Sequence, residues 1–170
     1  MLTLSDILVS QGSLTAEKAK LVALDQIQTG TPEEDIIIQK EFVNETQLAK
    51  AKAVYFNVPY VDLSQMPASP EALAVLSQDV AERFKVFPVS VDKGNKRIVL
   101  AMADPMNLSA IDFVERKTGY HVSAEVAEES VIKEFTDTKY AQSISREVTE
   151  AVSEVSVTRD EVKNYEAGSK

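Results

Sequence analysis

Few side chains in this 170-residue sequence are of types that catalyse reactions at neutral pH. The single histidine, His121, lies within residues 120–126, where apolar and polar residues alternate as in a β-strand. This alternation places His121 on the side opposite Tyr120 and Val122, and the sequence indicates no partner that would orient it as a general base. We therefore predict a surface histidine rather than a catalyst.

Two groups of carboxylates have positions that could support catalysis or metal binding. Asp104 follows a predicted strand, where catalytic acids often lie, but it also precedes Pro105 in "DPMN", a typical turn. The acidic run at residues 33–35 lacks the alternating spacing of a calcium loop and is typical of the first turn of a helix. We interpret Asp104 as a turn residue and the acidic run as a helix start.

Motifs for cofactors and phosphates are absent from the sequence. The five glycines, at positions 12, 30, 94, 119 and 168, never form GxxxxGK[ST] or GxGxxG. There is no cysteine, which excludes disulfides, thiolate catalysis and cysteine-based zinc sites. The sequence therefore predicts no cofactor, no metal and no enzymatic activity for this chain.

The charge and hydropathy of the chain exclude other classes of partner. With 27 acidic and 18 basic residues, the net charge of -9 argues against nucleic acid and against an anionic membrane surface. The longest apolar run, residues 98–103, is too short to span a bilayer. The N-terminus lacks the basic segment and apolar core of a signal peptide. We expect a cytoplasmic protein with no direct membrane insertion.

The elements that would position any site begin with a repeat. "DILVSQGSLT" starts at Asp6 and "DIIIQKEFVN" at Asp35, an interval of 29 residues. Thr15 and Asn44 are suitable N-caps for the amphipathic segments that follow each stretch. Each copy predicts a short apolar helix, a turn and a longer helix, and neither could bury its apolar face alone. The alternative is chance similarity between two helical hairpins.

The first of the longer helices has a predicted buried face, made of residues at helical spacing: Ala19, Val22, Ala23 and Ile27. After the second copy, two X-Pro steps make residues 57–70 extended, and we place a boundary between subdomains after residue 58.

Residues 59–140 combine short helices with strands. Short helices are predicted from Pro70 and Gln78, and two strands joined by "DKGN" form a hairpin whose first strand, because of Pro88, lies at an edge. A helix at residues 108–118 and a strand at residues 120–126 complete a strand–helix–strand unit, which predicts a parallel pair. A last helix covers residues 129–140. The predicted fold class is α+β: an N-terminal helical tandem-repeat subdomain (1–58), a small mixed-sheet α/β subdomain (59–140) and a C-terminal helical tail.

The tail, residues 141–170, carries a narrow apolar stripe at helical spacing: Ile144, Val148, Ala151, Val152 and Val155. Such a stripe is too narrow for a buried core helix. We expect it to fold back or to cover another protein surface, in a linker towards an absent domain.

Three stretches, together with the repeat, resemble a known family: "VPYVDL" (58–63), "VAERFKVFPV" (80–89) and "LAMADPMNLSAIDFVERKTG" (100–119). Residues 4–140 are similar to the N-terminal (MshEN-type) domain of the GspE/PilB family of type II secretion and type IV pilus assembly ATPases. The resemblance implies a regulatory and docking module whose ATPase domain lies outside this chain. The implied partners are that ATPase domain, neighbouring subunits of a hexamer, and cytoplasmic components of the inner-membrane platform.

In some members this domain is a cyclic di-GMP receptor, with tandem RLGxxLVxxGxI(x4)LxxALxxQ motifs whose five-residue spacer implies the same 29-residue period. The first copy here keeps five motif residues, which are the candidate ligand-site residues: Leu4, Leu8, Gly12, Leu14 and Gln26. It departs at Thr3, in place of arginine, and at Ser5, in place of glycine.

The second copy departs further, since Glu34 and Glu41 occupy both glycine positions and Tyr55 replaces glutamine. The glycines let backbone amides approach a ligand closely, whereas glutamate adds bulk and negative charge against an anion. The resemblance therefore implies a docking domain with degenerate cyclic di-GMP motifs. The alternatives are a cyclic di-GMP receptor that controls the ATPase, and a stand-alone small-molecule sensor.

Overall fold

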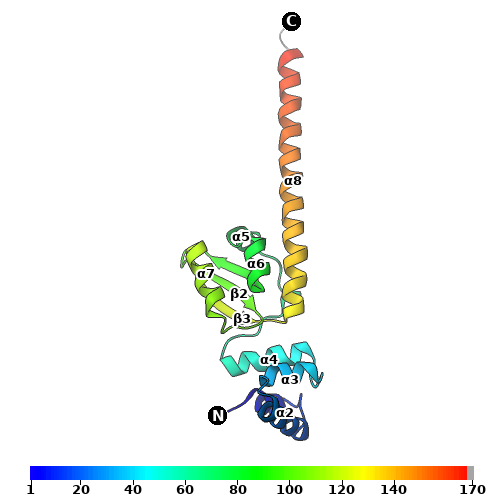
Figure 1. The fold of residues 1–170 in the computed structure, drawn as a ribbon. Helices are drawn as coiled ribbons and strands as arrows, with labels where there is room; N and C mark the ends of the chain where they lie inside the picture. Colours follow the sequence, from blue (N-terminus) through cyan, green and yellow to red (C-terminus); the bar gives the residue numbers. More distant parts are fainter. Residues whose placement is uncertain (168–170) are drawn as a thin grey trace.

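The computed structural model describes the backbone of residues 1–167 and the side chains of residues 1–153. The chain begins with four helices: α1 (Leu4–Ser10), α2 (Ala16–Thr29), α3 (Glu33–Gln39) and α4 (Glu45–Phe56). Figure 1 shows α2, α3 and α4 gathered at one end of the molecule, beside a small sheet, while the long last helix runs away from both.

The two pairs of helices repeat the same local structure. The start of α3 follows the start of α1 by 29 residues, and α4 follows α2 by the same interval. Thr15 and Asn44 both accept a hydrogen bond as N-caps, as expected from sequence. The short helices are both followed by a left-handed residue, Gly12 at φ 71° and Glu41 at φ 51°. The structure therefore confirms the predicted tandem repeat: α1 and α2 form one unit, and α3 and α4 form the other.

The two units also pack on each other. Their shared apolar cluster contains nine buried residues: Leu4, Ile7, Leu8, Leu14, Val22, Ile36, Ile37, Leu48 and Ala51. In addition, the carboxylate of Glu33 accepts hydrogen bonds from the backbone amides of Leu4 (3.2 Å) and Ser5 (2.8 Å). The first turn of the second unit therefore satisfies amides at the start of the first, which ties the units together by polar as well as apolar contacts.

The second part of the chain is built on a three-stranded mixed sheet. Its elements follow a 3₁₀ turn, η1 (Leu63–Gln65), and are α5 (Pro70–Val75), α6 (Gln78–Phe84), β1 (Val86–Asp92), β2 (Arg97–Met102), α7 (Leu108–Thr118) and β3 (His121–Val126). The strand order is β1-β2-β3, with β1 and β2 antiparallel and β2 and β3 parallel. This arrangement confirms the hairpin, the parallel pair and the α+β class.

Pro88 lies on an edge strand, as expected, and the register of β1 against β2 shifts between Pro88 and Ser90. The outer edge of β3 is met by the segment that follows α4, since the amide of Val61 donates to the carbonyl of Val126 at 2.9 Å. α4 also packs against β3 through Ala49 and Ala53. The division of the chain after residue 58 remains a proposal, because α4 contributes to both parts.

The last helix, α8 (Glu129–Ala167), is continuous through the point at which the sequence analysis separates a helix from a tail. Its first turns are held in the body, where Ile132 is buried and the hydroxyl of Tyr140 donates to the carbonyl of Leu76 at 2.6 Å. Beyond them, Ile144 and Val148 are each 56% exposed. The stripe therefore does not fold back within the described side chains; Val155, its last member, lies outside them.

Candidate functional site

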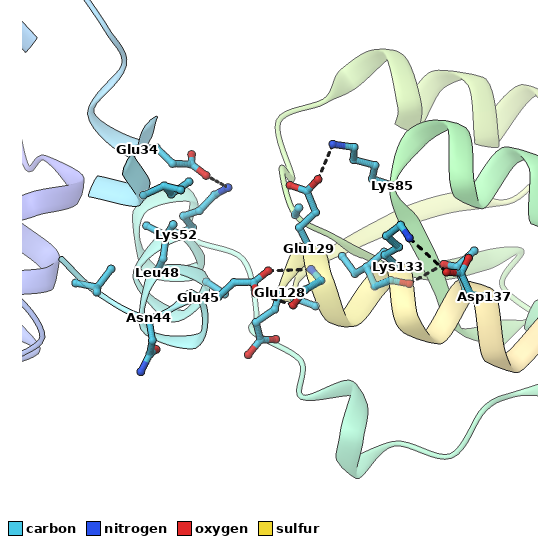
Figure 2. A pocket seen from close by; sticks show the side chains of 18 of the residues that line it. Glu34, Asn44, Glu45, Leu48, Lys52, Lys85, Glu128, Glu129, Lys133 and Asp137 are labelled. Carbon is cyan, nitrogen blue, oxygen red and sulfur yellow. Dashed lines mark hydrogen bonds and ion pairs between the residues drawn. The ribbon is translucent and has the colours of Figure 1, made fainter. Parts of the chain in front are cut away.

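A cleft of about 810 Å³ separates the second helical unit from the sheet-containing part of the chain. One wall is formed by α3, α4 and the loop between them, and the other by α6, the end of β2 and the first turns of α8. Figure 2 shows Glu34, Glu45, Leu48 and Lys52 on the first side, facing Lys85, Glu128, Glu129 and Lys133 on the second.

The floor of the cleft is apolar and contains several small side chains. The helical unit contributes Ile38, Val43, Leu48 and Ala49, and the opposite wall contributes Ala81, Ala103, Ala127 and Ile132. Ile38 is 52% exposed although it is a large aliphatic residue. An apolar floor of this kind favours an occupant with apolar groups of its own, because such groups are removed from water on binding.

The charged residues around the cleft are mainly acidic. The acids are Glu34, Glu41, Glu45, Glu82, Glu128, Glu129 and Asp137, and the bases are Lys52, Lys85 and Lys133. Each lysine already faces a carboxylate of the cleft: Lys52 with Glu34 at 2.6 Å, Lys85 with Glu129, and Lys133 with Asp137 at 3.5 Å. The lining therefore has an excess of four negative charges and no lysine without a carboxylate beside it.

Glu128 differs from the other acids because it is buried. The residue is only 7% exposed, and its Oε1 accepts a hydrogen bond of 2.7 Å from the hydroxyl of Tyr60. Burial, together with the hydrogen bond to Glu128 and its charge, raises the pKa of Tyr60 well above its usual value. Among the described residues, no lysine, arginine or histidine forms an ion pair with Glu128.

The two walls are joined at one point by a polar contact. The carboxylate of Glu45, at the start of α4, accepts hydrogen bonds from the amide (2.8 Å) and the hydroxyl (2.6 Å) of Ser130, at the start of α8. Residues 85 positions apart in sequence are thereby held together. The contact fixes the relative position of the two walls at the base of α8.

The five candidate residues of the first motif copy do not line this cleft. Leu4, Leu8 and Leu14 are buried in the core between the two units, and Gly12 forms the left-handed turn. Gln26 is exposed on α2. Three of the five therefore have a packing role and one a conformational role, and their part in ligand binding stays a prediction.

The positions at which the motif departs have defined roles in the structure. Thr3, in place of the family's arginine, forms a capping box with Asp6 at the start of α1. Glu34 and Glu41, in place of glycines, both line the cleft. Sequence reasoning did not single out Lys52, which is only 6% exposed and holds Glu34. The sequence did contain an indication of this pair. In the second copy, Lys52 stands at a position where the motif has an apolar residue, and Glu34 stands where the motif has glycine.

The residues considered for catalysis, His121 and Asp104, do not line the cleft. The side chain of His121 is 81% exposed, with Nδ1 at 3.8 Å from Oε1 of Glu115. Asp104 accepts a hydrogen bond from the amide of Met106 at 2.9 Å, which is the turn geometry expected from sequence. Within the described residues, no group of three or more histidine, cysteine or acidic side chains could hold a metal ion. Nor does the described part contain a helix that is both long and apolar enough to cross a bilayer.

Comparison with known proteins shows which family the chain is similar to. Residues 56–145 match the MshEN domain family. The chain is 25% identical over 166 residues to the type IV pilus assembly ATPase PilB of Myxococcus xanthus, covering 96% of this chain and 29% of that protein. It is 35% identical over 120 residues to the PilB of Thermus thermophilus, covering 68% of this chain and 13% of that protein. The chain thus spans less than a third of the length of either relative.

Two solved structures share the fold. A structure of MshE with cdg superimposes with a TM-score of 0.64 at 25% identity, covering 79% of this chain and 96% of that one. The N-terminal domain of XpsE superimposes with a TM-score of 0.57 at 23% identity, covering 79% of this chain and 91% of that one.

Proposed function

The chain belongs to the MshEN domain family, and from this premise we propose that it is a regulatory and docking domain of a type IV pilus assembly or type II secretion ATPase. The MshEN domain is non-catalytic, and the fold is shared with MshE and with the N-terminal domain of XpsE. The partners that we propose are the ATPase domain, neighbouring subunits of a hexamer, and cytoplasmic components of the inner-membrane platform. The domain then works in the cytoplasm and reaches the inner face of the membrane through these partners.

The observation that carries this proposal is the cleft between the two parts of the chain. Its walls come from α3 and α4 on one side and from α6 and α8 on the other. An occupant that contacts both walls binds best to one relative position of the two parts, so its binding is coupled to that position. A docking domain that also regulates needs such a coupling.

The charges of the cleft support a protein partner over an anionic ligand. A cyclic dinucleotide carries two phosphates, which bind to cations or to backbone amides. Here the lining has an excess of acids, and Lys52 is already paired with Glu34. The carboxylates of Glu34 and Glu41, which replace the motif glycines, would repel a phosphate bound beside them, because like charges placed together cost several kcal/mol.

A binding experiment tests the docking function. The 170-residue chain is immobilised, and the ATPase domain and the cytoplasmic parts of the platform proteins are passed over it separately. We expect at least one of them to bind, at a rate that falls as salt is added, because the net charge of -9 steers encounter with a basic surface. A chain carrying Ile144→Ser and Val148→Ser shows whether the exposed stripe of α8 contributes. Failure of every component to bind contradicts the proposal.

The second candidate function is a cyclic di-GMP receptor. It is favoured by the solved complex of MshE with cdg, the abbreviation of cyclic di-GMP, and by the five motif residues kept in the first unit. We expect calorimetry to show no binding tighter than about 10 μM, since the stacking arginine and three glycines are replaced. A variant with Thr3→Arg, Ser5→Gly, Glu34→Gly and Glu41→Gly tests the motif register, and it should gain affinity. Submicromolar binding by the unmodified chain would establish the receptor function instead.

A further inference from the structure

We propose that the cleft is the binding site of a basic amphipathic helix, whose apolar face covers the cleft floor and whose arginine or lysine forms an ion pair with Glu128. The proposal rests on the docking function above and names the surface and the chemistry of the partner segment. It is carried by the burial of Glu128, the apolar floor and the excess of acids around it.

Glu128 is the central observation, because a buried carboxylate without a cation is costly. An ionised carboxylate loses its hydration on burial, and proteins normally compensate with a cation or with several hydrogen bonds. Glu128 is 7% exposed, and within the part of the chain that the structure describes its carboxylate has one side-chain hydrogen bond, from the neutral hydroxyl of Tyr60. Its other oxygen is not fully buried, and Glu128 is one of the residues that line the cleft. A cation entering the cleft completes the interaction.

The floor beside Glu128 has room for apolar side chains. Ala81, Ala103 and Ala127 contribute only methyl groups to one wall, whereas Ile38 and Val43 stand on the opposite wall. Larger side chains from an occupant fit against the exposed Ile38 and the half-buried Val43 and Ala103, whereas Ala81 and Ala127 are almost fully buried. A helix presents apolar residues on one face at i, i+3, i+4 and i+7, and grooves between helices are a common binding site for such a face.

The remaining acids around the cleft determine which charge the bound helix must carry. Glu41 and Glu82 are exposed at the rim and form no ion pair within the described residues. They lie on opposite walls, Glu41 after α3 and Glu82 on α6, so a helix in the cleft passes between them. Basic residues flanking its apolar face meet negative charge on both sides, and an acidic helix is repelled.

The test uses synthetic peptides and the complete chain. The probe is a fluorescent amphipathic peptide of about 18 residues, five helical turns, with leucine on one face and arginine at its borders. A second peptide replaces every arginine with citrulline, which keeps the shape and removes the charge, and a third replaces every arginine with glutamate. We expect the arginine peptide to bind, the citrulline peptide to bind at least tenfold more weakly, and the glutamate peptide not to bind.

Variants of the chain locate the site. Glu128→Gln keeps an oxygen that accepts from Tyr60 and removes the charge, so it should fold normally and bind the arginine peptide at least tenfold more weakly. Its matched control, Glu134→Gln, removes an exposed charge of α8 outside the cleft and should change the affinity less than twofold. Ile38→Ser should weaken binding several-fold, and Ile27→Ser, at an 82% exposed position of α2, should leave it unchanged.

Each alternative result overturns the proposal. Equal losses from Glu128→Gln and Glu134→Gln indicate non-specific attraction of a basic peptide to an acidic protein. Equal binding of the citrulline peptide indicates that Glu128 needs no cation. If the Glu128→Gln chain retains full affinity for the partner found in the docking experiment, the docking function stands and the cleft is not its surface. If a small organic cation such as spermine binds at the cleft and excludes the peptide, the site is a small-molecule pocket.

Discussion

The left-handed residues that follow α1 and α3 allow opposite substitutions to be compared for stability within one chain. Gly12 and Glu41 occupy equivalent positions in the two units, at φ 71° and φ 51°. Both amides donate to the carbonyl three residues earlier at 3.0 Å, to Val9 and Ile38 respectively. The backbone is therefore the same, and only the first unit has the residue that adopts this conformation without strain.

The magnitude follows from the backbone alone. A Cβ added at Gly12 would meet nothing within 4 Å, so Gly12→Ala introduces strain without a clash. The left-handed conformation costs an L-residue roughly 1–2 kcal/mol. Reduced freedom of the unfolded chain offsets about 0.4–1 kcal/mol of this cost. We expect Gly12→Ala to destabilise the protein by about 1 kcal/mol and Glu41→Gly to stabilise it by a similar amount.

The assay is urea unfolding, supported by thermal unfolding, in which about 1 kcal/mol corresponds to a shift of about 2–4 °C for a protein of this size. Glu41→Ala is the control, because it removes the carboxylate and keeps the strain. It should change stability by less than about 0.5 kcal/mol. If Glu41→Gly is no more stable than Glu41→Ala, the gain assigned to the backbone is refuted. If Gly12→Ala costs nothing, the equivalence of the two turns is refuted as well.

Three further predictions concern buried polar contacts and catalysis. Tyr140→Phe removes the buried hydrogen bond to the carbonyl of Leu76 and should lower the free energy of unfolding by about 1–2 kcal/mol, measured by urea titration; no change would mean that water replaces the hydroxyl. Glu34→Ala leaves the ammonium of the buried Lys52 without its carboxylate and should cost about 1–3 kcal/mol, and adding Lys52→Leu should recover most of this loss if the ion pair is its cause. The purified chain should release no phosphate from ATP above the buffer rate in a coupled assay, and turnover that His121→Ala abolishes would contradict the non-catalytic assignment.

Most helices and strands could be predicted from sequence, because their ends carry local signals. α7 begins after Asn107, whose side chain accepts from the amide of Ala110, and it ends at the left-handed Gly119, both as expected. The continuity of α8 was not expected, although no glycine or proline interrupts the chain between Tyr140 and Ile144. For α2, the helical spacing of apolar residues predicted the helix correctly but not all of its buried face. Val22 and Ile27 were both expected to be buried, whereas Val22 is fully buried and Ile27 is 82% exposed.

The cleft could not be predicted, because its contacts join residues that are far apart in sequence. Glu128 meets Tyr60 across 68 residues, and Ser130 meets Glu45 across 85. Local patterns report helical faces and caps, and they contain no information on which helix lies opposite which. The family motif indicated that Glu34 stood at a position meant for glycine. It could not indicate that Lys52 compensates this change with an ion pair.

The length of α8 makes it a lever arm. Its first turns form one wall of the cleft and are anchored in the body up to Tyr140, whereas residues 141–167 extend beyond that anchor (Figure 1). At a rise of 1.5 Å per residue, this extension measures about 40 Å. A tilt of about 10° at the anchor therefore displaces the far end of the helix by about 7 Å, which exceeds the pitch of one helical turn, about 5.4 Å. With Tyr140 as the pivot, the anchored turns measure about 17 Å, so a shift of about 1 Å at the start of the helix, around Glu128 and Ser130, would move its far end by about 2 Å.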